Sequence, residues 1–575
     1  MSVHDNRRAT VSKRVTAFGG IRSIARISDV GASDMKNLRI LSDGSLEKRC
    51  GFETVILGSG SIRGYWEGSF SGVDYIFYIA GNTLYRLSQN DTSPVPITVL
   101  SASDHRVSFF LFRDRLYLLD GFTMLVFQPE SELFSVAQGY VPLYGKNWNP
   151  KTLGEINEPR NLLNTRLRVH YLNSSASKTF QLPFTANRVI SVRVNGTSVT
   201  TYTFQSGTSV VTLPDSYATG GDVVIAFEID SLFSMRSTVL KAYHAAVYRD
   251  GYHETLLTYG GSQGYRVWRS SEVSDEMLAE ARISDSSCDS LYVRDGTAFS
   301  LGSTEHPLTA AVQHLDRMLF FNDSGVWVLR HPHASDDDMV VSLYQEGIGC
   351  VAQDGAVLCR GVPYIISNSG IGKIGLYNAS SDISTLTLIS SDIADSLTAP
   401  VLKNCVLHWY DRDGQLWLRD TTDESGTVRL CDPDGKCWVR YTGIAANALI
   451  DYGGGPGFTT ASGRIARFSD TLVTDDGESF TAEYLSQYLD FSQPEFCKRS
   501  GYMAICADTD GASIGLTVES ERRSCQLRFD GKETAPPEFF GVRFGIGRFR
   551  FLRYRLAVGG NQRVRIYSLS ATVTI

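Results

Sequence analysis

The alternation of apolar and polar positions between residues 107 and 127 predicts three short strands joined by tight turns. Aromatic and aliphatic runs are separated there by the polar segments 113–115 and 120–123, the second of which begins with Asp-Gly. Asp-Gly is a preferred residue pair for hairpin turns. The stretch lacks the helical period of an amphipathic helix. We therefore expect a small antiparallel sheet here.

The same strand–turn–strand unit recurs along the chain. Copies lie at residues 73–87, 315–329 and 406–418, and a weaker copy turns at residues 367–370. Such a unit cannot bury both faces of its own sheet, so its repetition predicts a repeat architecture. Four-stranded blades around an axis, as in a β-propeller, fit this pattern, and the chain has room for about six to eight of them.

A second pattern interrupts these units between residues 177 and 230. Five short strand-like runs follow one another there, with an Asn-Gly turn at residues 195–196. The aromatic unit pattern lapses in this stretch and resumes at about residue 245. We interpret the stretch as a small inserted β-sandwich, and the alternative is one more blade.

These patterns predict an all-β protein, a β-propeller with an inserted small β-sandwich and a C-terminal β-sandwich domain. The predicted parts are an N-terminal arm at residues 1–33, the propeller at 34–140 and 242–470, a connector with the inserted domain at 141–241, and the C-terminal domain at 471–575.

Three local predictions complete this layout. A hairpin within residues 34–52 is expected to start the first blade, and the glycine-rich residues 453–457 are expected to form a loop of the last one. Residues 272–282 form the one expected helix, with Met277, Leu278 and Ala281 on its apolar face.

Charge and composition narrow the function classes. The net charge of −7 argues against nucleic-acid binding by the whole surface, although a local basic strip remains compatible with it. Residues 1–8 lack the apolar core of a secretory signal, and no run approaches the roughly 18 apolar residues of a membrane span. Ten scattered cysteines without a Cys-x-x-Cys pair predict reduced thiols.

Two short motifs occupy the start of the chain and the connector. The first joins residues 37–39 (Asn-Leu-Arg) to residues 43–52 (Asp-Gly-Ser-Leu-Glu-Lys-Arg-Cys-Gly-Phe). The second joins residues 140–142 (Tyr-Val-Pro) to Glu158 and residues 161–163 (Asn-Leu-Leu). The two motifs resemble the opening and the connector of propeller-like tail proteins of tailed bacteriophages, which include the nozzle or hub of short-tailed phages. That family usually has Arg-Pro-Gly-Phe or Arg-x-Gly-Tyr where this chain has Cys50.

The resemblance implies a structural virion protein, a tail nozzle or hub that forms part of the DNA-ejection channel and docks neighbouring tail proteins. It implies a homo-oligomeric ring, six-fold at the short-tailed phage nozzle. The implied partners are adaptor and fibre or spike proteins, with phage DNA in transient passage. Such a protein is made in the host bacterial cytoplasm and resides in the virion tail, without stable membrane insertion.

Candidate catalytic and metal-binding patterns are incomplete. Three Asp-x-Asp-Gly segments, at residues 411–414, 432–435 and 508–511, offer fewer carboxylates than a Ca²⁺ loop needs, and we interpret them as turns. His331 and His333 have a spacing that suits a metal, but the pair alone does not define a site. Residues 260–264 match Gly-x-Ser-x-Gly, yet a strand follows where a nucleophile elbow requires a helix.

We therefore assign no catalytic, cofactor-binding or metal residues, and we predict a protein that is not an enzyme and needs no cofactor. The alternative function is a carbohydrate-binding or carbohydrate-cleaving propeller, acting as a receptor-binding part of the tail. The complete Ser-x-Asp-x-Gly-x-Thr-Trp turns of sialidases are missing from the sequence, which speaks against that alternative.

Arginines alternate with other residues near the C-terminus. They are Arg548, Arg550, Arg553, Arg555, Arg563 and Arg565. At the two-residue period of a strand, this pattern makes one face cationic and the other apolar. Such a face is a solvated surface, a contact to carboxylates of a neighbouring subunit, or the lining of a channel for phosphates. Because a channel that passes DNA should not bind it tightly, we favour the subunit contact.

Overall fold

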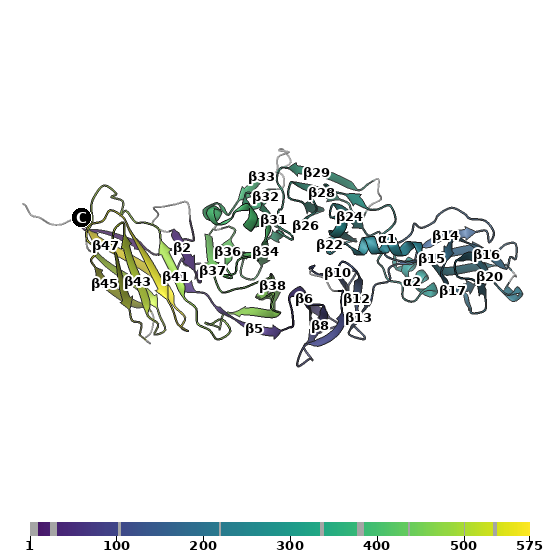
Figure 1. Cartoon of the computed structure of the whole chain (residues 1–575), viewed down its shortest axis with the longest axis horizontal. Helices are drawn as coiled ribbons and strands as arrows, with labels where there is room; N and C mark the ends of the chain where they lie inside the picture. Colours follow the sequence, from purple (N-terminus) through teal and green to yellow (C-terminus); the bar gives the residue numbers. More distant parts are fainter. Residues whose placement is uncertain are drawn as a thin grey trace, which may run out of the picture. The chain divides into compact units, whose positions relative to one another are not determined.

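The computed structural model describes residues 10–22, 31–101, 105–217, 220–333, 338–375, 385–434, 437–499, 501–532 and 537–575 (Figure 1). Parts of the predicted N-terminal arm and of the turn at 432–435 lie outside these ranges. The chain divides into two compact units, Met1–Ile62 with Ile348–Ile575, and Arg63–Gly347. Strands make up most of the described residues, which confirms the all-β class.

The described part of the second unit contains four sheets of four consecutive antiparallel strands. They are β6 (Ile62–Phe70), β7 (Val73–Ala80), β8 (Thr83–Ser88) and β9 (Val95–Val99); β10 (Ser108–Phe112), β11 (Arg115–Leu119), β12 (Met124–Gln128) and β13 (Leu133–Val136); β22 (His244–Arg249), β23 (Glu254–Tyr259), β24 (Arg266–Arg269) and β25 (Phe299–Ser300); and β26 (Ala310–His314), β27 (Arg317–Phe321), β28 (Gly325–Arg330) and β29 (Val340–Glu346).

The first unit adds three four-stranded groups within its described residues. They are β30 (Ala356–Cys359), β31 (Val362–Ser367), β32 (Gly370–Gly375) and β33 (Thr385–Leu388); β34 (Cys405–Tyr410), β35 (Gln415–Asp420), β36 (Val428–Asp432) and β37 (Cys437–Tyr441); and β38 (Ala448–Tyr452), β39 (Gly455–Thr459), β40 (Arg464–Ser469) and β5 (Gly51–Leu57). The strand–turn–strand units predicted from the sequence are confirmed.

Two details of the last group correct the sequence-based expectations. The predicted loop at 453–457 is wrong in extent, because residues 455–457 already belong to β39 and pair with β38. The fourth strand, β5, comes from the N-terminal part of the chain and pairs antiparallel with β40. Backbone hydrogen bonds therefore join the N-terminal strand β5 to β40, the last strand of the series of four-stranded groups.

Consecutive sheets within each unit share apolar clusters. Phe77 of β7 and Phe127 of β12 lie with their ring centroids 4.8 Å apart. Tyr259 of β23 and Phe320 of β27 meet edge to face at 5.6 Å. In the first unit, side chains of β31 and β35, including Ile366, pack in one buried cluster. Each sheet thus covers a face that its neighbour would otherwise leave exposed.

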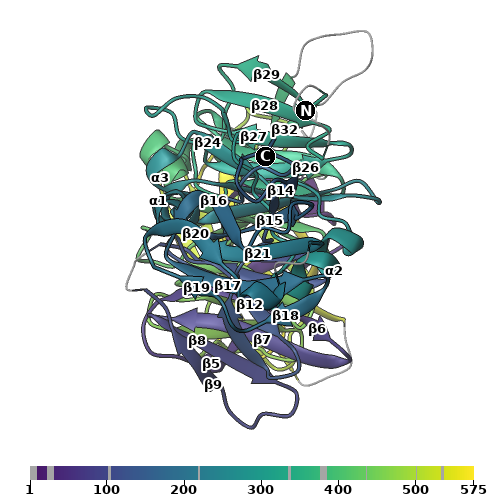
Figure 2. The same cartoon turned by 90° about the vertical axis from the view of Figure 1, so that its right-hand side faces the viewer.

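Two further sheets interrupt the second unit and share a core of their own (Figures 1 and 2). Trp148, Tyr171, Phe180 and Phe227 are buried in that core. The five-stranded sheet has the order β14 (Leu143–Trp148), β15 (Arg166–Leu172), β21 (Asp222–Glu228), β17 (Arg188–Val194), β18 (Thr197–Val199), and the smaller sheet the order β16 (Thr179–Ala186), β20 (Thr208–Thr212), β19 (Thr203–Phe204).

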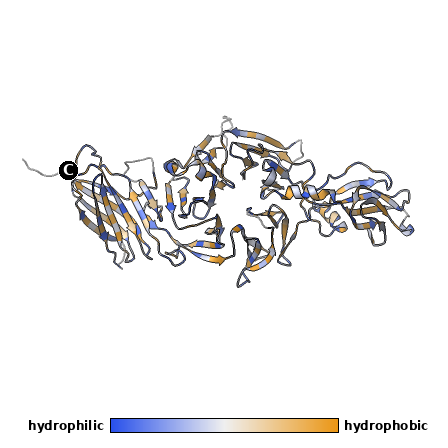
Figure 3. Ribbon diagram, viewed as in Figure 1, coloured by the Kyte–Doolittle hydropathy of each residue, from blue (hydrophilic) through white to orange (hydrophobic). Residues whose placement is uncertain are grey.

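The first unit also contains a two-sheet C-terminal region around one large apolar cluster. Apolar and polar stretches alternate along its strands (Figure 3). One sheet has the order β3 (Leu38–Ile40), β4 (Leu46–Lys48), β47 (Arg565–Thr574), β42 (Gly501–Asp508), β45 (Glu538–Phe544), with β1 (Thr10–Val15) on β47; the other continues from β37 through β2 (Ala32–Lys36), β41 (Ala482–Ser486), β46 (Leu552–Val558), β43 (Ile514–Ser520) and β44 (Ser524–Phe529).

This arrangement corrects the assignment of the hairpin within residues 34–52. Its strands β3 and β4 do not start the first four-stranded unit but join β47 at the opposite end of the chain. The local pattern predicts the hairpin correctly, but it carries no information about which distant strand the hairpin pairs with. The predicted division of the chain into domains stays a prediction.

Three α-helices occur among the described residues: α1 (Ser231–Leu240), α2 (Asp275–Ser284) and α3 (Ala399–Lys403). The predicted helix is confirmed as α2, where Ser274 caps the first turn by accepting a hydrogen bond from the Met277 N–H at 3.2 Å. Helices α1 and α3 were not predicted. Within the described ranges no helix has the length and apolarity that a membrane crossing requires. None of the ten cysteines, all of which lie in the described ranges, forms a disulfide bond.

Candidate functional site

The first motif places a buried guanidinium between the sheets of the first unit. Arg49 lies between β4 and β5, and its side chain has 0% exposure. Nη1 and Nη2 donate to the two carboxylate oxygens of Asp475 at 2.8 and 2.5 Å. The guanidinium also lies 3.9 Å from the ring centroid of Phe480. A bidentate partner and an aromatic face compensate the charge for its lost hydration.

Asn37 completes this buried network. Its Nδ2 donates to the Thr481 carbonyl at 2.9 Å and to Thr442 Oγ1 at 3.1 Å. Its Oδ1 accepts from Arg49 Nε at 3.1 Å and from the Thr442 N–H at 2.9 Å. The amide therefore uses its full hydrogen-bonding capacity. Asn37 has φ 55° between β2 and β3, where the chain passes from one C-terminal sheet to the other.

The end of the motif is explained by close packing. A Cβ on Gly51 would lie 1.8 Å from the Thr474 carbonyl oxygen, so only glycine fits there. Phe52 packs edge to face on Phe458 at 4.9 Å, joining β5 to β39. Cys50, the residue at which the chain departs from the tail-protein pattern, is half-buried, and burial raises the pKa of its thiol.

The second motif makes an equivalent buried joint in the second unit. Asn161 has 0% exposure, and its Nδ2 donates to the carbonyls of Tyr140 and Leu291, each at 2.8 Å. Its Oδ1 accepts from the N–H groups of Leu163 and Val293, each at 3.0 Å. One side chain thus satisfies four backbone groups from three separate segments, which holds the connector in place.

The carboxylate of Glu158 also holds the connector in place. Its Oε2 accepts from the Leu143 N–H at 2.6 Å and from the Tyr140 hydroxyl at 3.0 Å. Burial raises the pKa of Glu158, against the opposing effect of these two hydrogen bonds. Within the connector, residues 143–148 form the strand β14.

The six predicted arginines do not form one surface. Arg553 and Arg555 lie on β46, whereas Arg565 begins β47 in the other C-terminal sheet and Arg563 lies just before it. Four of them form ion pairs within the chain: Arg553 with Glu519 at 2.7 Å, Arg555 with Glu483 at 3.2 Å, Arg563 with Glu47 at 3.0 Å, and Arg565 with Asp43 at 2.6 Å. Arg548 and Arg550 are exposed and precede β46.

The alternation that predicted these strands is present. Tyr554 and Leu556 are buried and alternate with the partly exposed Arg553 and Arg555, as a strand with one apolar face requires. The carboxylate partners could not be identified from the sequence, because Glu519 and Glu483 come from β43 and β41, which flank β46 in the sheet. Hydrogen bonds from Ser45, together with Arg565, lower the pKa of Asp43 to about 2.

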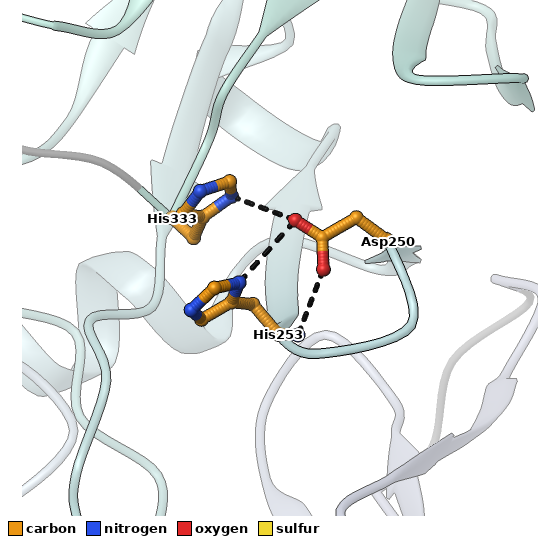
Figure 4. Close-up of side chains that lie close together, drawn as sticks. All are labelled: Asp250, His253 and His333. Carbon is orange, nitrogen blue, oxygen red and sulfur yellow. Dashed lines mark hydrogen bonds and ion pairs between the residues drawn. The ribbon is translucent and has the colours of Figure 1, made fainter.

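The other sequence candidates have mostly local roles. Residues 411–414 form the turn between β34 and β35, as predicted. Residues 260–264 link β23 to the strand β24, so no helix follows them. His331 is exposed, with its ring centroid 6.2 Å from that of His333. His333 points instead toward Asp250 and His253, two residues that sequence analysis did not select (Figure 4).

Comparisons with known proteins do not assign a family. No protein-family model matches the chain, and no curated protein matches it. Among solved structures, a functionally unknown protein from Desulfotomaculum acetoxidans DSM 771 has 10% identity and a TM-score of 0.30, over 69% of this chain and 87% of that one. YCF48 from Cyanidioschyzon merolae has 12% identity and a TM-score of 0.26, over 73% and 99%. Similarities this low do not establish a shared fold.

Proposed function

We propose that this chain is a structural component of a bacteriophage tail, a nozzle or hub that works as a ring, lines part of the DNA-ejection channel and docks neighbouring tail proteins. The observation that carries the proposal is the position of the two tail-protein-like motifs. Asn37, Arg49 and Asn161, which belong to them, are buried and hold separate segments of the chain together. Residues that join separate segments of a chain are the ones that proteins of the same architecture need, so these contacts support the proposal.

The proposed architecture is a β-propeller with two β-sandwich regions. Seven four-stranded groups occur among the described residues, and consecutive groups within each unit share buried apolar clusters. Four-stranded sheets that cover one another in series are the building units of a propeller. Pairing of β5 with β40 supports the proposal, because it ties the N-terminal part of the chain to the last group.

Ring formation requires two different surfaces of each subunit to meet. The exposed Arg548 and Arg550 offer a cationic contact for carboxylates of a neighbouring subunit. Arg553 and Arg555 have carboxylate partners within the chain, so they orient β46 rather than supply unpaired charge. Adaptor and fibre or spike proteins are the remaining proposed partners, and DNA passes without stable binding.

Deletion and complementation of the gene in its phage test this function. We expect the deletion to yield DNA-filled heads without the distal tail structure, and the full chain supplied in the host to restore complete tails in electron micrographs. Normal tails and normal infectivity in the deletion strain would refute a nozzle or hub role. A glycan array and a glycoside hydrolase screen on the purified chain test the carbohydrate alternative.

A further inference from the structure

Two loops of consecutive sheets in the second unit bring three metal-binding side chains together (Figure 4). Asp250 and His253 lie at the turn between β22 and β23. His333 follows β28 in the next sheet. The ligand atoms of the three side chains all lie within 4.8 Å of one another. The cluster therefore spans two sheets whose strands are some eighty residues apart in sequence.

One carboxylate oxygen is the centre of this cluster. Asp250 Oδ2 lies 3.3 Å from His253 Nδ1 and 3.3 Å from His333 Nδ1. The two imidazole rings are stacked, with centroids 4.3 Å apart and planes 3° from parallel. The Nδ1 atom of His333 is buried, and its approach to Asp250 lacks hydrogen-bond geometry. A buried ring nitrogen without a hydrogen-bond partner can bind a metal ion instead.

The surroundings hold the ligands in place. The backbone N–H groups of Tyr252 and His253 donate to Asp250 Oδ1 at 3.0 and 2.8 Å. Oδ2 is thereby left facing the imidazoles. The buried Arg269 donates to the Pro332 carbonyl at 2.8 Å and so positions the residue before His333. Partners of this kind orient metal ligands and limit the motion needed for binding.

We propose that Asp250, His253 and His333 bind one divalent cation of the zinc type. Zinc–nitrogen and zinc–oxygen bonds of about 2.0–2.2 Å place neighbouring ligands of a tetrahedral site about 3.3–3.5 Å apart. The two nitrogen–oxygen separations of 3.3 Å match that spacing. Binding turns the rings away from parallel so that both Nδ1 lone pairs point at the ion. Water completes the coordination.

The bound ion would link two sheets, the one that contains β22 and β23 and the one that contains β28. The three side chains are 22–35% exposed, so the ion can enter from solvent. The sequence-based prediction assigned no metal residues, so the proposed site differs from it. Of the pair His331 and His333, only His333 belongs to the proposed site. The proposed site is independent of the proposed tail function.

Zinc titration of the chelator-treated full-length chain tests the site. We expect one equivalent of Zn²⁺ by isothermal titration calorimetry and a higher melting temperature in the zinc-bound protein. His253→Gln and His333→Gln should each weaken binding at least tenfold. Asp250→Asn should abolish the visible absorption of the Co²⁺-substituted protein, since that signal reports ligand geometry directly.

His331→Gln is the matched control, because His331 lies next to the site and outside the cluster. It should bind Zn²⁺ as the wild type does. The proposal is overturned if the wild type binds no zinc, or if the ligand variants bind it as tightly as the wild type. Loss of binding in His331→Gln equal to that in His333→Gln would also overturn it. His253→Gln decides the outcome if His333→Gln fails to fold, since the His253 side chain is partly exposed.

Discussion

At the scale of single residues, the most informative contact is the buried pair of Arg49 and Asp475. The two residues are 426 positions apart, yet their hydrogen bonds at 2.8 and 2.5 Å join the N-terminal motif to the segment before β41. Breaking a buried pair costs more than the pair contributes, because the remaining charge has neither water nor a partner. Arg49 is therefore a residue on which the fold of the first unit depends.

Asp475→Asn tests that dependence. The substitution keeps the size of the side chain but leaves the buried guanidinium uncompensated, so we expect the free energy of unfolding to fall by about 3–5 kcal/mol. Urea denaturation followed by tryptophan fluorescence measures it. The matched control is Asp434→Asn, whose partner Arg360 is exposed, and which should change stability by about 1 kcal/mol or less. Equal effects of both variants would contradict the assigned role of Asp475.

At the scale of secondary-structure elements, the sequence predicts strands well and their partners poorly. The two-residue period and the short polar turns identify β10, β11 and β12 without further information. The same local pattern identifies β3 and β4 but cannot show that β4 pairs with β47, which is more than 500 residues away. Helix α1 was missed because the exposed Phe233 lies outside the face shared by Leu232 and Val239, so the helical stripe is weak.

The connector offers a prediction of pH dependence. Burial raises the pKa of Glu158 above that of an unfolded chain, so its protonated form favours the folded state. This stability is present below the unfolded pKa and is lost as the pH rises through the folded pKa. Glu158→Gln stays neutral, so its melting temperature should improve relative to wild type between pH 4 and pH 8. A difference between the two proteins that is the same at both pH values would contradict this.

Excision tests whether the two inserted sheets are self-contained. Residues 166 and 228 are neighbours in the β15–β21 ladder, and the Ile229 N–H donates to the Thr165 carbonyl at 2.9 Å. We expect the chain to keep its four-stranded groups when residues 166–228, which supply every strand of the inserted sheets except β14, are replaced by a short Gly-Ser linker. Circular dichroism and thermal unfolding report the result. The control is removal of residues 73–88, which form β7 and β8 and whose loss should prevent folding of the second unit. If the variant without residues 166–228 does not fold, the inserted sheets are needed for folding of the rest of the chain.

At the scale of the whole molecule, the candidate sites divide into two kinds. The motif residues were found from sequence, because each motif lies within a short stretch of the chain. The cluster of Asp250, His253 and His333 was not, because its members lie on turns of different sheets and become neighbours only in the fold. The ion pairs of Arg553 and Arg555 could not be predicted from the sequence for the same reason. Assembly into a ring belongs to this scale and stays a prediction.

Arg548→Glu combined with Arg550→Glu tests the proposed subunit contact. Arg553 is left unchanged, because its guanidinium is held by Glu519 within the chain. We expect a folded protein with a melting temperature near that of the wild type that fails to enter tails. The control, Arg360→Glu with Arg528→Glu, changes the charge equally at two other exposed positions and should be incorporated normally. Wild-type incorporation of the Arg548 and Arg550 variant, scored by electron microscopy of complemented particles, would rule out this contact.

The tail location of the chain can be measured by immunogold electron microscopy of purified phage particles, with antibodies raised against the purified chain. We expect gold at the tail of intact virions and no label on tails from a strain that lacks the gene. Label confined to particle-free fractions of the lysate, with unlabelled tails, would contradict the claim that the chain is a structural part of the tail.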